Sequence, residues 1–327
     1  MNKNFLDFMH EYAGQKIAVG VSGGVDSVAL LHWLVEIGAD VVCLHVNHNL
    51  RAAAKTEAKY VQDLCKKLGV ECHVFSWDGE KPETGLEDAA RLARYKFMTD
   101  FCHKNKIKII ATAHQADDQI ETFWMNLGRG SGVYGLAAMR PVGEMNGVKI
   151  IRPLLNVFRR ELREYCDSRG IKYFADEMNY DPHYTRVKIR QNRHLVGDAL
   201  GISDERILLA IQNMGRVRET LESDVDKLVA RVMFDGRAMF RDSFLFDQSP
   251  DIRLKFIGTI IQMVGGDRYQ PRLNSLVSAL DKLHADCKFT IGHCTVRRLR
   301  GRILIVQEGK KTSFRIRKRY GKKYIKK

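Results

Sequence analysis

The 327-residue sequence lacks the features that mark a secreted, membrane-spanning or disulfide-rich protein. Its seven cysteines form no Cys-x-x-Cys pair, which disfavours zinc, iron–sulfur and dithiol redox sites. No run approaches the roughly 18 apolar residues that a membrane helix needs. The first residues, MNKNFLDFMHEYAGQK, show no basic segment followed by an apolar one. We therefore expect a cytoplasmic protein with mostly buried, reduced thiols and no membrane partner.

Acidic residues are almost missing from the last part of the sequence. Residues 295–327 contain fourteen Lys or Arg and one acidic residue, Glu308, so this segment carries +13 of the net charge of +15. Phe314, Tyr320 and Tyr324 are interleaved with these charges. The composition suits a polyanion such as RNA, with aromatic rings for base stacking. A solvated tail without a partner would have the same composition, so both interpretations stay open.

Apolar β-branched runs alternate with helical patterns over the first two-thirds of the chain. The pattern predicts strands at 16–21, 40–46, 70–75, 108–113 and 148–153. It predicts helices at 27–37, 55–68, 86–104, 116–127, 157–169 and 203–231, and an irregular polar segment at 173–193. Strands separated by helices of this length predict the α/β class, with a parallel, doubly wound, Rossmann-like sheet. Ligands of such sheets lie at the carboxyl ends of the strands.

A change of character near residue 215 predicts two domains, residues 1–215 and 216–327. The second is expected to hold a helical linker and a smaller, basic α+β domain. Its helices are expected at about 251–264 and 271–284. A hairpin should follow, with strands at 288–299 and 302–307 and a turn at Gly301-Arg302.

The segment KIAVGVSGGVDSVALL, residues 16–31, predicts an anion site. Its glycines allow a sharp turn between a strand and a helix, and the first amides of that helix are unpaired at the positive end of the dipole. Phosphate is the usual ligand of such a turn. No Gly-Lys-Ser/Thr follows, so this is not a Walker loop. Asp26 would repel a phosphate unless a cation lay between them, which implies Mg²⁺. The alternative is an ordinary glycine-rich turn.

Two helical segments carry further candidate residues. In GLEDAARLARYKF, residues 85–97, Arg91 and Arg94 share a helical face, which suits phosphate or carboxylate recognition but also fits a solvated surface. In ATAHQADDQIET, residues 111–122, carboxylates cluster where a strand ends. Such a cluster suits Mg²⁺ binding or proton abstraction.

These segments resemble a known group of enzymes. Ser22–Ser27 (SGGVDS) resembles the loop of the N-type ATP pyrophosphatases, or PP-loop proteins, which split ATP into AMP and pyrophosphate. Within that group the tRNA(Ile)-lysidine synthetases are similar to this chain at further motifs. The matching motifs are HVNHNLR at 45–51, AARLARY at 89–95, His-x-x-x-Asp-x-x-Glu-Thr at 114–122, GRGSGVYG at 128–135, IRPL at 151–154, and Arg186 with Arg190. Met178 and Val187 depart from the family pattern, where Thr and Asn are usual.

The resemblance implies a role for each matching residue. The implied ATP-binding residues are Ser22, Gly23, Gly24, Val25, Asp26, Ser27, Val46 and His48, although a histidine of this loop could simply pack there. The implied Mg²⁺ ligands are Asp26 and Asp118. The implied catalytic residues are Asp26, Arg94, Asp118 and Arg186. The implied tRNA or substrate contacts are Arg91, His114, Glu121, Thr122, Arg129 and Arg190. Whether Asp118 is a metal ligand or the base that deprotonates the amine stays open.

The resemblance also implies a reaction. Members of the family use ATP to adenylate the C2 oxygen of the wobble cytidine in the CAU anticodon of tRNA(Ile), and the ε-amine of free L-lysine then displaces AMP. The basic C-terminal unit would bind the tRNA. The protein would be a monomer or a homodimer. A tRNA thiolase is a weaker alternative because paired cysteines are missing, and an amide synthetase such as NAD synthetase would not explain the basic tail. A catalytically inactive RNA-binding protein would show no ATP–pyrophosphate exchange.

Overall fold

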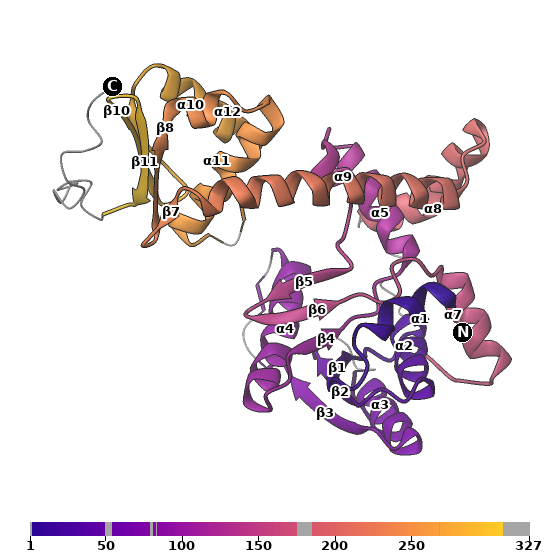
Figure 1. Cartoon of the computed structure of the whole chain (residues 1–327). Helices are drawn as coiled ribbons and strands as arrows, with labels where there is room; N and C mark the ends of the chain where they lie inside the picture. Colours follow the sequence, from indigo (N-terminus) through magenta and orange to yellow (C-terminus); the bar gives the residue numbers. More distant parts are fainter. Residues whose placement is uncertain are drawn as a thin grey trace. The chain divides into compact units, whose positions relative to one another are not determined.

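The computed structural model describes residues 2–49, 54–78, 81–82, 84–174, 185–267 and 269–309. The chain divides into two compact units, Met1–Val217 and Arg218–Lys327, close to the boundary expected at 215 (Figure 1). The division falls within helix α9 (Asp204–Ala230). Leu50, Arg51, Met178 and the basic segment 310–327 lie outside the described residues. Over the described part of the chain, no helix is long and apolar enough to span a membrane.

The first unit is built on one six-stranded sheet in the order β3-β2-β1-β4-β6-β5. Its strands are β1 (Ile17–Gly20), β2 (Val41–Asn47), β3 (Glu71–Ser76), β4 (Ile109–Ala111), β5 (Val142–Met145) and β6 (Val148–Ile151). All neighbours are parallel except β5, which runs antiparallel to β6 at the edge. The predicted parallel sheet is confirmed, and β5 is an addition. The strand order reverses direction between β1 and β4, which is where sheets of this kind bind ligands.

Helices cover both faces of this sheet, as the doubly wound class requires (Figure 1). On one face lie α1 (Lys3–His10), α2 (Val25–Glu36), α3 (Ala54–Leu68) and α7 (Arg159–Ser168), and on the other lies α4 (Leu86–Lys104). The remaining helices, α5 (Ala116–Leu127), α6 (Val133–Leu136) and α8 (Thr185–Leu200), pack with one another beyond the sheet. Alternate residues of β1 face opposite cores, because side chains alternate along a strand. Ile17 and Val19 pack with α2, α3 and α7, whereas Ala18 packs with Tyr95 and Met98 of α4.

Two helix predictions need correction. Helix α2 begins at Val25, not at Ser27, so Asp26 lies in its first turn. The segment 173–193 was predicted to be irregular, yet Thr185–Leu200 is helix α8. Its arginines pair with carboxylates of α5, and this tertiary charge compensation is invisible in a polar sequence pattern.

The second unit packs helices on a five-stranded antiparallel sheet in the order β7-β8-β11-β10-β9. Its elements are β7 (Met233–Phe234), β8 (Arg237–Arg241), α10 (Asp242–Phe246), α11 (Pro250–Gly265), α12 (Leu273–His284), β9 (Lys288–Ile291), β10 (Cys294–Leu299) and β11 (Arg302–Gln307). The buried side chains of α11, including Phe256, Ile257 and Ile260, form the centre of its core. This is the smaller α+β unit that the sequence predicted.

Its hairpins differ from the prediction in two places. The single strand expected at 288–299 is interrupted by a turn at Gly292-His293, where both residues have positive φ. The next turn is Arg300-Gly301, one residue earlier than predicted, because Leu299 and Arg302 are register partners. Both central residues of this turn also have positive φ. Two-residue loops with positive φ match the right-handed twist of antiparallel strands.

Candidate active site

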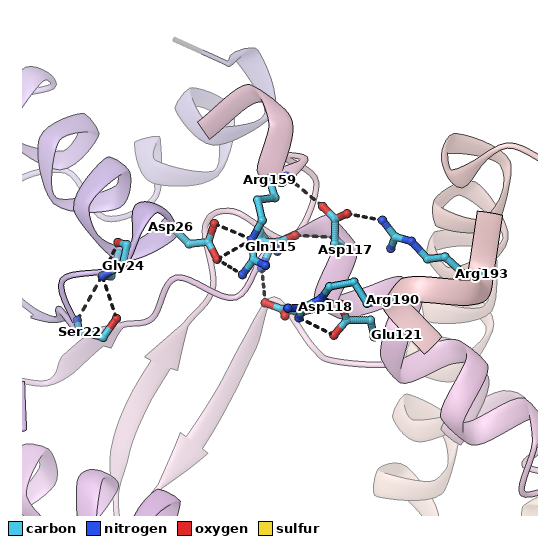
Figure 2. Close-up of polar contacts among 11 residues, drawn as sticks. Ser22, Gly24, Asp26, Gln115, Asp117, Asp118, Glu121, Arg159, Arg190 and Arg193 are labelled. Carbon is cyan, nitrogen blue, oxygen red and sulfur yellow. Dashed lines mark hydrogen bonds and ion pairs between the residues drawn. The ribbon is translucent and has the colours of Figure 1, made fainter. Parts of the chain in front are cut away.

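The phosphate loop lies where β1 ends and α2 begins, and its own hydroxyls hold it in shape. The Ser27 Oγ atom accepts from the Ser22 amide at 3.1 Å and donates to the Gly24 carbonyl at 3.0 Å. Gly23 has a φ of +94°, which favours glycine there. Gly24 is the N-cap residue of α2 and lies beside Ser22 (Figure 2). It provides no side-chain cap, so amides of the first turn stay available to an anion.

The segment that follows α7 closes one side of this loop. The Phe174 amide donates to the Gly23 carbonyl at 3.0 Å, and the same residue bridges Gly24. A Cβ placed on Gly23 would lie 3.6 Å from both Phe174 and Val61 of α3. The loop is therefore held between two elements that are distant in sequence, and the motif alone did not indicate either contact.

The carboxylates after β4 come from the first turn of α5. Asp118 and Gln115 form a capping box, in which the Asp118 carboxylate accepts from the Gln115 amide at 3.1 Å. The Asp117 carboxylate accepts from the Arg159 amide at 2.9 Å and pairs with the Arg193 guanidinium. The helix therefore directs two neighbouring carboxylates to different partners (Figure 2).

Asp26 does not stand alone beside the loop, because Arg159 of α7 reaches it. The Nη2 atom of Arg159 lies 2.6 Å from Oδ2 of Asp26, and its Nε atom also donates to this carboxylate. Burial alone would lower the pKa of Arg159, but the bonds to Asp26 and the charges of Asp118 and Glu121 raise it above its ordinary value. The two side chains therefore form a firm ion pair.

The electrostatics of Asp118 set it apart from its neighbours. Burial, and then the negative charges of Glu121 and Asp26, raise its pKa from 3.8 to about 6. A divalent cation beside Asp118 would offset the negative charges of Glu121 and Asp26 that act on it, and carboxylate oxygens are ligands that Mg²⁺ prefers. The donor set of Asp26 and Asp118 therefore fits the implied metal.

Glu121 and Arg190, both expected to contact substrate, pair with each other. The Arg190 Nε atom donates to Oε1 of Glu121 at 2.6 Å, and the Glu121 side chain is only 1% exposed. Thr122 donates from its hydroxyl to the Asp118 carbonyl at 2.7 Å, and Arg129 is exposed just beyond α5. The pair joins α5 to α8, so it has a structural role whatever else it contacts.

Four arginines from three segments of the chain lie near His114. Burial lowers the pKa of this imidazole well below its ordinary value, and four nearby positive charges lower it further: those of Arg91, Arg152, Arg94 and Arg186. The sequence named three of these four. Arg91 and Arg94 also lie over the ring of Tyr95. A neutral histidine among several cations makes this an anion-attracting region beside the carboxylates.

The end of β2 brings two histidines with different surroundings. The His45 ring is buried, and its Nδ1 atom donates to the Val21 carbonyl at 2.8 Å, which ties the ends of β1 and β2 together. Val46 and His48 are partly buried. Burial, and then the charge of Arg94, lower the pKa of His48 to about 4, so its ring is uncharged at neutral pH. An uncharged ring suits contact with a nucleobase.

Sequence inspection missed Arg152, Arg159 and Arg193. Arg152 was part of a matched motif but received no role, and Arg159 sits in a run of arginines on an amphipathic helix. A charged residue that pairs with a distant residue leaves no recognisable pattern in the sequence around it. Asp26 and Arg159, for example, are 133 residues apart. These residues could be found only once the elements were placed in space.

The cysteines also come closer than their spacing indicated. The Sγ atoms of Cys43, Cys65 and Cys72 all lie within 4.8 Å of one another, because β2 and β3 pair Cys43 with Cys72 beneath α3. Cys43 and Cys65 are wholly buried. The cluster is packed into the core of the unit and not into the phosphate site.

Comparison with known proteins agrees with this geometry. The PP-loop domain family matches residues 1–195. A tRNA(Ile)-lysidine synthase from Ruegeria pomeroyi is 37% identical over 304 residues, which cover 90% of this chain and 72% of that protein. The tRNA(Ile)-lysidine synthase of Wolbachia pipientis wMel is 32% identical over 314 residues, covering 91% and 72%.

Among solved structures, a U34-tRNA thiolase from Methanococcus maripaludis aligns with a TM-score of 0.55 at 17% identity, covering 65% of this chain and 78% of that one. That likeness concerns the fold alone. The phosphate loop, the carboxylates of α5 and the similarity to curated relatives over most of the sequence together show that the chain belongs to the tRNA(Ile)-lysidine synthase family of PP-loop proteins.

Proposed function

We propose that this protein is the ATP-dependent ligase that attaches lysine to C2 of the wobble cytidine in the CAU anticodon of tRNA(Ile), forming lysidine. One observation carries the proposal most: the phosphate loop after β1 and the carboxylates after β4 meet at the point where the strand order reverses. Nucleotide and acceptor can therefore be brought together at one edge of the sheet. We propose that the enzyme acts in the cytoplasm, where ATP and tRNA are both available.

In the first half of the reaction the C2 oxygen of cytosine attacks the α-phosphorus of ATP. Ser22–Ser27 would hold the phosphates through backbone amides at the start of α2. Val46 and His48 would border the adenine. Asp26 would hold Mg²⁺, which when bound offsets phosphate charge. Arg94 and Arg186, both near His114, would stabilise the negative charge that develops on the transferred phosphate.

In the second half the ε-amine of lysine attacks C2 and AMP leaves. An amine must lose its proton to act as a nucleophile, and a base with a pKa close to the working pH is the most effective. The pKa of Asp118, about 6, meets this requirement. Of the two roles open to Asp118, this favours the base and leaves Asp26 as the principal carboxylate for Mg²⁺.

The cytidine must be unstacked to reach this site, as a single-stranded anticodon loop allows. We propose that Arg91, His114, Glu121, Thr122, Arg129 and Arg190 contact the tRNA or lysine, and that the basic C-terminal unit binds tRNA backbone. Arg129 is exposed, whereas Glu121 and Arg190 would have to exchange their mutual pairing for a substrate.

Lysine incorporation into tRNA tests the proposal. The protein is incubated with a tRNA(Ile) transcript bearing CAU, with ATP and with isotopically labelled lysine, and the digested nucleosides are analysed for lysidine. A transcript with uridine at the wobble position serves as the matched control. Label in lysidine from the first transcript alone supports the proposal. Tight tRNA binding without lysine incorporation and without ATP–pyrophosphate exchange would instead identify an inactive RNA-binding protein.

A further inference from the structure

Arg159 is a cation beside the phosphate loop that no sequence motif had singled out. It lies at the start of α7 and makes its ion pair with Asp26 in the first turn of α2. Asp26 is in turn the carboxylate that the proposed function assigns to Mg²⁺. The Arg159 guanidinium contacts this carboxylate (Figure 2). Binding of Mg²⁺ and ATP at Asp26 would therefore change the charges that surround Arg159.

The hydrogen bonding of Arg159 leaves donor capacity unused. Its Nε and Nη2 atoms donate to Asp26. Within the described residues, the Nη1 atom of Arg159 donates no hydrogen bond. The side chain is 26% exposed, and that of Asp26 is 16% exposed. A guanidinium can bind a carboxylate on one edge and phosphate oxygens on another, because its five donors lie in one plane.

The loop needs a cation that it does not itself contain. The single basic residue in residues 16–31 is Lys16, which precedes β1 and lies at the opposite end of that strand. Walker loops carry a lysine that reaches the terminal phosphates, and this loop has no counterpart. Arg190 and Arg193 are held by Glu121 and by Asp117 with Asp204. Arg159 also has a carboxylate partner, but that partner, Asp26, belongs to the phosphate-loop motif itself, so among the described residues its guanidinium lies directly beside the loop.

We propose that Arg159 binds the pyrophosphate half of ATP: it neutralises Asp26 when no nucleotide is bound, and it would turn to the β- and γ-phosphates when Asp26 holds Mg²⁺. This inference rests on the proposed function, because it assumes cleavage between the α- and β-phosphates. When the C2 oxygen of cytosine bonds to the α-phosphorus, the bond from that phosphorus to the α,β-bridging oxygen breaks. Its electron pair leaves with pyrophosphate, and Arg159 stabilises that charge.

The test measures binding of the two product halves separately. Arg159→Gln removes the charge but keeps an amide that can still donate to Asp26. Isothermal titration with inorganic pyrophosphate and Mg²⁺, and separately with AMP, is run on the wild-type protein and on this variant. Arg160→Gln is the matched control, since the neighbouring Arg160 pairs with Glu205 at the surface. Circular dichroism and a thermal melt check that each variant is folded.

We expect Arg159→Gln to weaken pyrophosphate binding by about 10- to 100-fold, the range for losing a charged hydrogen bond, and to leave AMP affinity within about twofold. Arg160→Gln should change neither. The measurement is repeated at saturating Mg²⁺. If Arg159 served only to neutralise Asp26, excess Mg²⁺ would supply the missing charge and restore pyrophosphate affinity.

Restored affinity at saturating Mg²⁺, or equal weakening of AMP and pyrophosphate, would overturn the inference and leave Arg159 a structural partner of Asp26. If Arg159→Gln does not fold, Arg159→Met is used instead, because it also removes the charge and keeps an unbranched side chain; normal pyrophosphate binding by that folded variant would refute the contact. The proposed function fails in a different way: wild-type protein would then incorporate no lysine into tRNA, whatever its affinity for pyrophosphate.

Discussion

Replacing Asp118 with Asn should make the first unit more stable while removing activity. The pKa of Asp118 is raised from 3.8 to about 6, first by burial and then by Glu121 and Asp26. A pKa difference of one between the folded and unfolded states corresponds to about 1.4 kcal/mol, so the ionised carboxylate costs the folded state up to about 3 kcal/mol. Asn is neutral, has nearly the same shape and keeps an oxygen that can accept from the Gln115 amide.

The pH dependence follows from the direction in which this pKa moves on folding. The folded protein holds the Asp118 proton more tightly than the unfolded chain does, so this group favours folding below about pH 4. That contribution is lost as the pH rises through about 6. Asp118→Asn should therefore gain up to about 3 kcal/mol in free energy of unfolding at pH 7.5, and the gain should vanish near pH 4.

Urea unfolding in chelator-treated buffer, followed by tryptophan fluorescence, measures this gain. All three tryptophans, Trp33, Trp77 and Trp124, lie in the first unit, so the signal reports on that unit.

Asp117→Asn is the control variant, for which a change of stability of opposite sign is expected. Burial alone would raise the pKa of Asp117, but hydrogen bonds from the Arg159 amide and Arg193 outweigh it and lower the pKa. That variant should lose stability at pH 7.5, and the loss should shrink as the pH falls. A stability difference for Asp118→Asn that is absent or independent of pH would refute the reasoning.

Three further predictions concern catalysis and RNA binding. Asp26→Ala should fold, as judged by circular dichroism, yet lose nearly all lysine incorporation because the carboxylate for Mg²⁺ is gone; near-normal turnover would contradict this role. Arg94→Ala should cost far more turnover than Arg91→Ala, about 100-fold or more if Arg94 stabilises the transition state, and equal losses would show that the wrong arginine was chosen. Truncation after Gly309 should weaken tRNA binding and flatten its salt dependence, by roughly 0.7–0.9 in slope per lost phosphate contact. ATP affinity should stay unchanged, and a lowered melting temperature with an unchanged salt slope would assign residues 310–327 a structural role instead.

Prediction from the sequence worked best where a site is formed by consecutive residues. Ser22–Ser27 contains its own turn, its own hydrogen bonds and the first turn of α2, so the phosphate site could be recognised without a structure. The parallel strands were also recognisable, because buried runs such as Ile17–Gly20 are apolar on both faces. Short, partly exposed strands such as β5 have no such signal and were missed.

Prediction was weakest where a residue depends on a partner from another element. Glu121 and Arg190 were each expected to contact substrate, which stays a prediction, but their ion pair across α5 and α8 was not anticipated. The helix at 185–200 was missed for the same reason, since its packing and ion pairs with α5 are contacts that its own polar sequence does not reveal.

The sequence by itself determined the class of fold, the phosphate loop and the family, because these depend on local periodicity and contiguous motifs. The tertiary structure alone decided that Arg159 neutralises Asp26, that Arg152 joins the arginines around His114, and that burial and neighbouring carboxylates raise the pKa of Asp118. The physical reason is that Coulomb energies and desolvation depend on distance and burial in space. Those quantities are set only when segments as far apart in sequence as Asp26 and Arg159 pack against one another.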